Sequence, residues 1–315
     1  MRLDASHAIG KTSVCLSPLA SPTQLADAGA GIELAYETFG DDGATPVVLI
    51  HGLATQMLGW PAEFCAGLGD RGHRVIRFDN RDVGLSTHLH QAPPVDLVAL
   101  LRGDTSSAPY RLHDMAADTV GLLDALGLDA AHFVGASMGG TIAQTLAIEQ
   151  PQRVLSLTSV MSTTGDPEVG QPSAEAMAAI LSPPASDRAG AIERAVRAYR
   201  VVGSPGFPFD ELGVRDRAGR SFDRAHDPAG AMRQLAAVAA SGDRTAALRR
   251  VTVPTLVIHG RDDIVAAVSG GIATAQAVPE AELLIIEGMG HDLPRALWPQ
   301  IIDRISRLVE RANVD

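Results

Sequence analysis

Five short apolar runs constrain the fold of this chain more than any other feature. They are rich in Val, Ile and Leu, and they span residues 46–52, 73–80, 131–137, 255–263 and 282–291. Each run is apolar on both faces, which suits strands of a parallel sheet with helices on either side. Helical patterns fall between the runs, so the sequence predicts an α/β fold with a mostly parallel, doubly wound sheet.

Two more segments predict strands of a different kind. Residues 154–162 form a sixth, less continuous apolar run. Residues 32–40 alternate between polar and apolar side chains, which predicts an antiparallel strand at the edge of the sheet.

Three helices are predicted between and after these strands. One helix ends before Gly127, another runs from Met138 to near Glu149, and the last has Pro299 near its start. Residues that share one face at helical spacing, all but one of them apolar, mark the first and last of these helices: Leu112, Met115, Thr119, Leu122, Leu123 and Leu126, and then Ile301, Ile302, Ile305, Leu308 and Val309.

The alternation of strands and helices stops between residues 163 and 246. This stretch has helical patterns, separated by Pro and Gly, and no strand pattern. We expect it to be a helical cap inserted after the sixth strand, between the two parts of the core, residues 31–162 and 247–315. Residues 1–30 read as a flexible leader that is not a secretory signal.

Composition excludes several classes of function. The net charge of −11 disfavours nucleic acid as a partner, because its phosphates would be repelled. The two cysteines have no spacing that suits a disulfide framework or a metal site. No run approaches the roughly 20 apolar residues of a membrane span. We expect a cytoplasmic protein without a cofactor, as a monomer or homodimer.

Ser137 lies in the segment "GASMG", directly after one predicted strand and directly before a predicted helix. A serine on so tight a turn exposes its hydroxyl, and only small residues two positions away on either side avoid a clash. Gly135 and Gly139 meet that need. The alternative is a glycine-rich turn with an ordinary serine, but the strand–turn–helix context favours a nucleophile.

A serine nucleophile needs a base and an acid to orient that base, and both are expected after later strands. His291 follows an apolar run and two glycines and is the predicted base. Asp263 is the predicted acid, because the third residue after Gly260 can point back across the strand ends. Asp262 is then a turn or capping residue, and Asp166 is a remote alternative acid.

When a serine nucleophile attacks a carbonyl group, the carbonyl oxygen becomes an oxyanion. Two backbone N–H groups are expected to bind this oxyanion. Met138 supplies one at the start of its helix. Leu53 supplies the other, because Gly52 allows an unusual backbone conformation; the alternative is a plain turn.

Two other assignments leave alternatives open. Trp60 and Met161 are predicted to line a substrate pocket, although each could equally be ordinary core. Asp79 and Asp82 could hold a metal, but we favour a structural network in which Arg81 pairs with carboxylates.

These motifs together resemble the α/β-hydrolase fold superfamily over residues 31–310. Within it, "GWPAEF", "VIRFDNRDVGLS", "GASMGGTIAQ", "VTVPTLVIHGRDD" and "GMGHDLP" resemble the aclacinomycin methylesterase group and LipG-like bacterial lipases and esterases. The resemblance implies carboxylic-ester hydrolysis, with Ser137, Asp263 and His291 as the triad and Leu53 and Met138 as oxyanion donors. It does not imply a polyketide methyl ester as substrate, because the His51–Gly52 pair and the cap differ from the methylesterase pattern.

The expected function is therefore a serine hydrolase that cleaves a small-molecule ester through an acyl-enzyme. A carbon–carbon bond hydrolase of the same fold is the first alternative, because it can use the same triad. A non-enzymatic binding protein on a hydrolase scaffold is the second.

Overall fold

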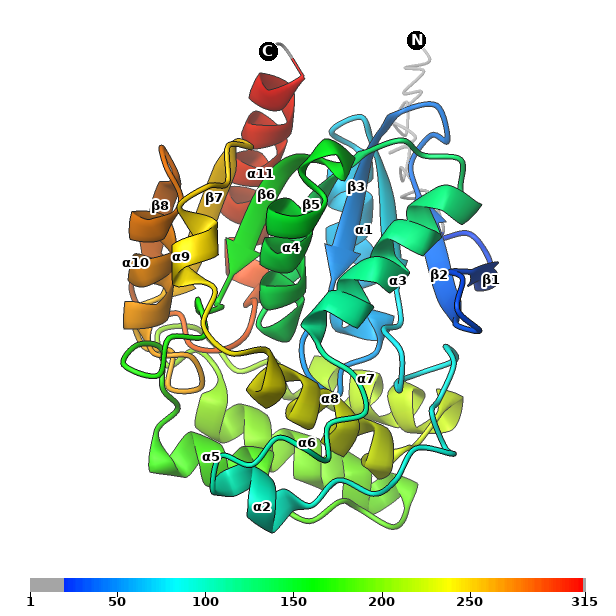
Figure 1. Cartoon of the computed structure of the whole chain (residues 1–315), viewed down its shortest axis with the longest axis vertical. Helices are drawn as coiled ribbons and strands as arrows, with labels where there is room; N and C mark the ends of the chain where they lie inside the picture. Colours follow the sequence, from blue (N-terminus) through cyan, green and yellow to red (C-terminus); the bar gives the residue numbers. More distant parts are fainter. Residues whose placement is uncertain (1–19, 314–315) are drawn as a thin grey trace, which may run out of the picture.

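One eight-stranded sheet organises the molecule. The computed structural model describes residues 20–313. The strand order is β1-β2-β4-β3-β5-β6-β7-β8 (Figure 1). The strands are Gln24–Asp27 (β1), Glu33–Phe39 (β2), Thr45–Ile50 (β3), His73–Phe78 (β4), Ala131–Ala136 (β5), Val154–Val160 (β6), Thr255–Gly260 (β7) and Glu282–Ile286 (β8). β2 pairs antiparallel with β1 and β4, and all other pairs are parallel, which confirms the predicted fold class.

Helices cover both faces of this sheet (Figure 1). Helices α1 (Ala62–Gly69) and α11 (Trp298–Ala312) pack on one face, around a core that includes Phe64 and Ile305. Helices α3 (Leu112–Ala125) and α4 (Met138–Glu149) pack on the other. Helix α10 (Val268–Ala277) contacts β7 and β8.

The predicted apolar stripes face these cores. All five residues of the α11 stripe are buried, as are five of the six on α3, with Leu126 partly buried. Burying each large apolar side chain contributes about 1.5–3 kcal/mol. The stripes therefore attach these helices to the sheet more strongly than helix propensity alone could.

The segment between β6 and β7 is helical, and the described chain has no strand there. It contains α5 (Ala174–Ile180), α6 (Arg188–Val202), α7 (Glu211–Arg224), α8 (Pro228–Ser241) and the short α9 (Thr245–Leu248). Figure 1 shows α5 to α8 grouped at the end of the sheet toward which the parallel strands point. We call residues 163–246 the helical segment. The remaining short helices are η1 (Met57–Gly59), α2 (Leu97–Leu101), η2 (Pro151–Arg153) and η3 (Arg295–Leu297).

Two expectations about the N-terminal part are wrong. Strand β1 lies inside residues 1–30, which were expected to be a flexible leader, and its pairing with β2 makes β1 the edge strand in place of β2. The strand gives little signal because it is four residues long and only Ala26 is buried. The rest of the leader prediction, residues 1–19, lies outside the described residues.

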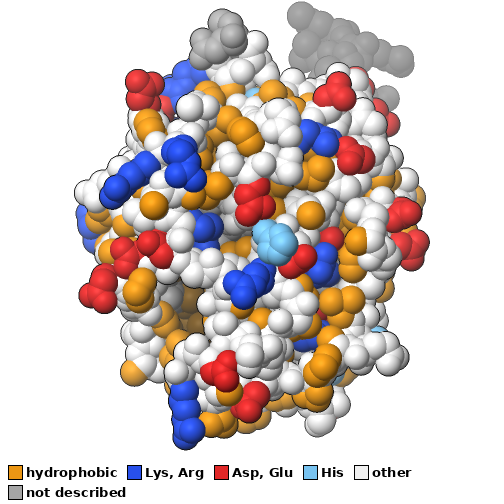
Figure 2. Space-filling model, viewed as in Figure 1, with side chains coloured by type: hydrophobic (Ala, Val, Ile, Leu, Met, Phe, Trp, Pro, Cys, Tyr) orange, Lys and Arg blue, Asp and Glu red, His pale blue; other side chains and the backbone are white. Residues whose placement is uncertain are grey.

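On the face shown in Figure 2, acidic and basic side chains are interspersed. Among residues 20–313, no helix has the length and apolar character needed to cross a bilayer.

Candidate active site

Ser137 occupies a strained turn between β5 and α4. Its φ of 55° and ψ of −121° are rare for a residue with a side chain, and such a conformation costs on the order of 1–3 kcal/mol. A Cβ at residue 135 would collide with the Gly139 carbonyl, and one at residue 139 would collide with the Ile50 carbonyl. The turn therefore fits beside β3 only because Gly135 and Gly139 have no side chains.

His291 lies within hydrogen-bonding distance of Ser137. Its Nε2 is 3.0 Å from the Ser137 Oγ. The imidazole sits on the loop after β8, and its own backbone N–H donates to the Val202 carbonyl at the end of α6 over 2.8 Å. The Gly290 N–H donates to the Ser204 hydroxyl over 2.9 Å. The helical segment therefore fixes the loop that carries this histidine.

Asp263 completes a chain of hydrogen bonds. Its Oδ2 is 2.7 Å from the His291 Nδ1, and its Oδ1 accepts the N–H groups of Val265 (2.8 Å) and Ala266 (3.0 Å). Burial raises the pKa of this carboxyl, but the charge of His291 and hydrogen bonds from His291 and His259 outweigh burial and lower its pKa overall. The group is thus a buried carboxylate, poised to orient an imidazole.

The two other aspartates lie elsewhere. Asp262 is exposed and accepts the Gly288 N–H over 2.9 Å, which braces the turn beside the histidine loop. Asp166 accepts the Glu168 N–H within its own loop. Of these three aspartates, Asp263 alone bonds to His291.

His259 precedes Gly260 at the end of β7, where a histidine is expected to support the loop, and it lies beside the site. It is fully buried, its Nε2 is 2.7 Å from the Ala266 carbonyl oxygen, and the same nitrogen is 3.5 Å from the Asp263 Oδ2. It holds the turn that carries Asp263. The separation of four residues between His259 and Asp263 in "HGRDD" is the sequence signal for this contact.

The turn after β3 comes close to the serine. A Cβ on Gly52 would lie 3.0 Å from the Ser137 Cβ. Within residues 20–313, neither the Leu53 N–H nor the Met138 N–H donates to a protein acceptor. An oxyanion site requires N–H groups that have no protein acceptor.

Trp60 and Met161 lie in the hydrophobic core. Trp60 is fully buried and stacks on Phe64, with ring centroids 5.4 Å apart, and Met161 is 4% exposed. This packing accords with the core alternative left open by the sequence. A substrate contact for either residue stays a prediction.

The carboxylates after β4 are paired with arginines. Asp79 pairs with Arg224 at 2.9 Å and Asp82 with Arg233 at 2.7 Å. Arg81 pairs with Asp118, as the structural-network prediction required. Two of these pairs join the core to the helical segment, so the cluster acts as a brace and has no free ligand set for a metal.

One three-residue cluster has metal-ligand atoms close together. The ligand atoms of His88, His90 and Asp227 lie within 4.8 Å of one another. However, the Asp227 Oδ2 already accepts from Arg233 Nη2 at 3.1 Å. His88 is 2.7 Å from the same carboxylate oxygen, and its other nitrogen is 3.0 Å from the Gly84 carbonyl. The cluster is accounted for as a polar contact between a core loop and α8.

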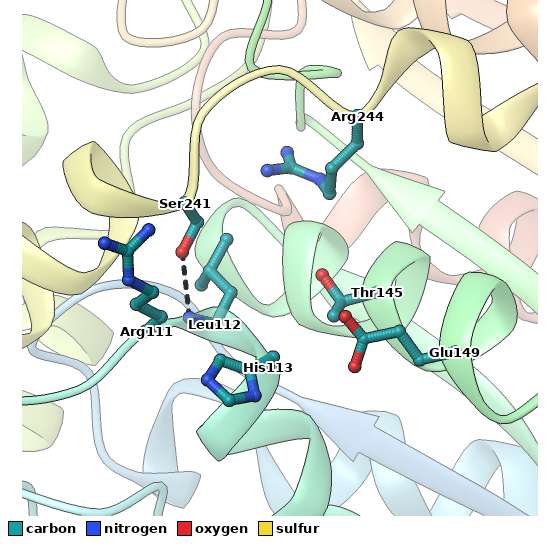
Figure 3. A pocket seen from close by; sticks show the side chains of 7 residues that line it. All are labelled: Arg111, Leu112, His113, Thr145, Glu149, Ser241 and Arg244. Carbon is teal, nitrogen blue, oxygen red and sulfur yellow. Dashed lines mark hydrogen bonds between the residues drawn. The ribbon is translucent and has the colours of Figure 1, made fainter.

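A cavity of about 220 Å³ lies apart from the serine (Figure 3). It is lined by Arg111, Leu112, His113, Thr145, Glu149, Ser241 and Arg244. Glu149 ends α4, about 18 Å along the helix from the turn that holds Ser137. None of the predicted site residues lines this cavity.

These features define a hydrolase fold with a serine on a strand–helix turn. Similarity to known proteins agrees with this class. A family model described as alpha/beta hydrolase fold matches residues 45–196. The chain belongs to the alpha/beta hydrolase fold family.

Within that family, particular relatives sharpen the picture. The chain is 32% identical to rhodomycin D methylesterase DnrP of Streptomyces peucetius, over 90% of this chain and 97% of the relative. This confirms the resemblance to the methylesterase group. The chain is also 30% identical to 2-hydroxymuconate semialdehyde hydrolase of Pseudomonas putida, over 84% of this chain and 85% of the relative. A solved hydrolase from Pseudomonas aeruginosa PA01 has a TM-score of 0.66 at 26% identity, covering 92% of this chain and 97% of its own.

Proposed function

We propose that this protein hydrolyses carboxylic esters, with Ser137 as nucleophile, His291 as base and Asp263 as acid. The observation that carries the proposal is the unbroken chain of contacts from the Ser137 Oγ through both imidazole nitrogens to the Asp263 carboxylate. The named activity of the methylesterase relative supports the same reaction class.

The mechanism follows from this chain. His291 Nε2 takes the proton of the Ser137 hydroxyl as its oxygen attacks the ester carbonyl. The N–H groups of Leu53 and Met138 bind the oxyanion that develops. His291 returns the proton to the leaving alcohol, which leaves an acyl-enzyme. His291 then takes a proton from a water molecule, which attacks the acyl-enzyme and releases the acyl group as a carboxylic acid. Asp263 keeps the imidazole in the tautomer with its proton on Nδ1 and stabilises the imidazolium.

The helical segment is the proposed cap over this site. It lies at the carboxyl end of the strands, where ligands bind in open α/β sheets. The proposed substrate is a small-molecule ester held between the sheet and these helices, with Trp60 and Met161 as candidate contacts.

The direct test is Ser137→Ala with a panel of p-nitrophenyl esters. Turnover should fall by about 10⁴-fold or more while the fold stays intact, because the attacking atom is lost. Wild-type Ser137 should also be labelled by a fluorophosphonate. Undiminished turnover by S137A would overturn the proposal, and an unlabelled wild type would favour the binding-protein alternative.

A carbon–carbon bond hydrolase remains the second candidate, favoured by the similarity to 2-hydroxymuconate semialdehyde hydrolase. Such an enzyme can use the same triad on a ring-cleavage product. Assaying that product beside the ester panel separates the two functions. Faster turnover of the ring-cleavage product would favour this candidate.

A further inference from the structure

The turn that carries Leu53 has an unusual backbone. Ala54 has a φ of 56°, the left-handed region that residues with a side chain rarely adopt. Within the turn, the Thr55 N–H donates to the Gly52 carbonyl over 3.2 Å, and the Thr55 hydroxyl donates to the Leu53 carbonyl over 3.0 Å. Such local bonds are common in turns, and they do not explain why Ala54 adopts the left-handed conformation.

A side chain from the helical segment holds the same turn. Gln234 on α8 is fully buried, and its Oε1 accepts the Ala54 N–H over 2.8 Å. Its Nε2 donates to the Arg81 carbonyl over 2.8 Å. The reverse orientation of the amide would put donor against donor and acceptor against acceptor, so the two bonds fix its orientation.

These contacts fix a peptide plane next to the proposed oxyanion donor. The Ala54 N–H and the Leu53 carbonyl belong to one peptide group, and Gln234 and Thr55 bind its two ends. The Leu53 N–H belongs to the adjoining peptide group, so its direction depends on this plane. Without Gln234, the turn can relax toward negative φ at Ala54 and rotate that N–H.

We propose that Gln234 is a positioning residue that aims the Leu53 N–H at the oxyanion. The inference rests on the proposed function and deepens it: the helical segment helps to build the oxyanion site as well as to cover it. Helix α7 supports the same loop, because the Gln56 Nε2 donates to the Ser221 carbonyl (2.8 Å) and the Ala225 carbonyl (3.0 Å).

The main test compares Gln234→Leu with wild type on a p-nitrophenyl ester. Deleting an oxyanion donor outright costs about 10²–10³-fold in kcat, so misaiming one should cost about 10- to 100-fold, with KM within about threefold. Phenylboronic acid forms a tetrahedral adduct on a nucleophilic serine, with an oxygen where the oxyanion develops. Its affinity should fall in parallel with kcat.

The matched control is Ala237→Gly, on the same helix and also fully buried but in the hydrophobic core. Glycine weakens the helix, so its midpoint of thermal unfolding should fall while kcat stays within about twofold. A purely structural role for Gln234 would make Q234L behave like A237G, with a lower midpoint of thermal unfolding and a nearly unchanged kcat.

Gln234→Glu is a second variant that keeps the shape of the side chain. Its carboxylate would face the Arg81 carbonyl without a proton, whereas a protonated carboxyl can donate to that oxygen. The ratio of Q234E to wild-type kcat should therefore rise as pH falls. This variant also carries the test if Q234L does not fold.

Three results would overturn the inference: kcat of Q234L within twofold of wild type, a rise in KM alone, or a pH-independent Q234E ratio. If wild type hydrolyses no ester, the proposed function fails separately. Faster hydrogen exchange of the Ala54 amide in folded Q234L would still support the positioning contact, and unchanged exchange would refute it.

Discussion

The turns at Ser137 and Ala54 both hold a residue with a side chain at positive φ, yet they are held in different ways. Ser137 is held by its neighbours, because Gly135 and Gly139 let two backbone segments approach closely. Ala54 is held by Gln234, which is 180 residues away in the sequence. The first turn is encoded locally, whereas the second depends on the fold of the helical segment.

The largest effect should come from closing the space around the first turn. Gly139→Val places side-chain atoms against the Ile50 backbone, which cannot yield as a flexible side chain would. We expect little folded protein and ester hydrolysis at least about 10⁴-fold below wild type. Soluble yield, circular dichroism and fluorophosphonate labelling measure this. A well-folded, labelled G139V would show that the turn tolerates more than its packing indicates.

Asp263→Asn tests the site with both turns left intact. An amide can stabilise the wrong tautomer of His291, so kcat should fall by about 10³–10⁴-fold. Folding lowers the pKa of Asp263, so this group stabilises the fold above its unfolded pKa of about 3.9, and that stability is lost as pH falls through the folded pKa. D263N should therefore lose less stability than wild type on acidification below about pH 4. Denaturant melts at several pH values measure this, and identical pH dependence would contradict it.

A smaller effect is expected from the ion pair that ties α7 to the core beneath the second turn. Asp79 is fully buried, accepts the Met57 N–H over 2.6 Å, and pairs with Arg224. Arg224→Met leaves that carboxylate without a cation, which should cost about 3–5 kcal/mol of stability.

The pH dependence of R224M gives a second readout. Burial already raises the pKa of Asp79, Arg224 opposes that rise, and its loss raises the pKa further. A carboxyl with a raised pKa favours folding more as it becomes protonated, so part of the lost stability should return as pH falls toward about 4. Urea melts of both proteins at pH 4 to 8 test this. A deficit that does not shrink with falling pH would argue against the buried carboxylate.

The smallest effect is expected at the exposed pair of Arg188 and Asp223, whose side chains are both 53% exposed. Solvent screens such pairs, so Arg188→Ala should leave the melting midpoint and kcat indistinguishable from wild type. It is the surface counterpart of R224M. A clear loss of stability would mean that the outer helices of the segment depend on their charges.

Residue patterns predicted the parallel sheet, because strands buried on both faces need continuous apolar sequence. They also predicted the tight turn at Ser137 and the three residues of the hydrogen-bonded chain. Each of these residues follows a predicted strand and is marked by a motif of only a few neighbouring residues. Strand β1 was missed because only one of its four residues is buried. The role of Gln234 was missed because it depends on a contact made only in the folded chain.

The bond from the His291 backbone to Val202 has a consequence for protein engineering. Residues 163–246 cannot be exchanged as an independent module, because the end of α6 fixes the loop that carries the imidazole. A chimera that imports these helices from a relative will need a matching carbonyl at that position, or its histidine loop will drift even when every triad residue is kept.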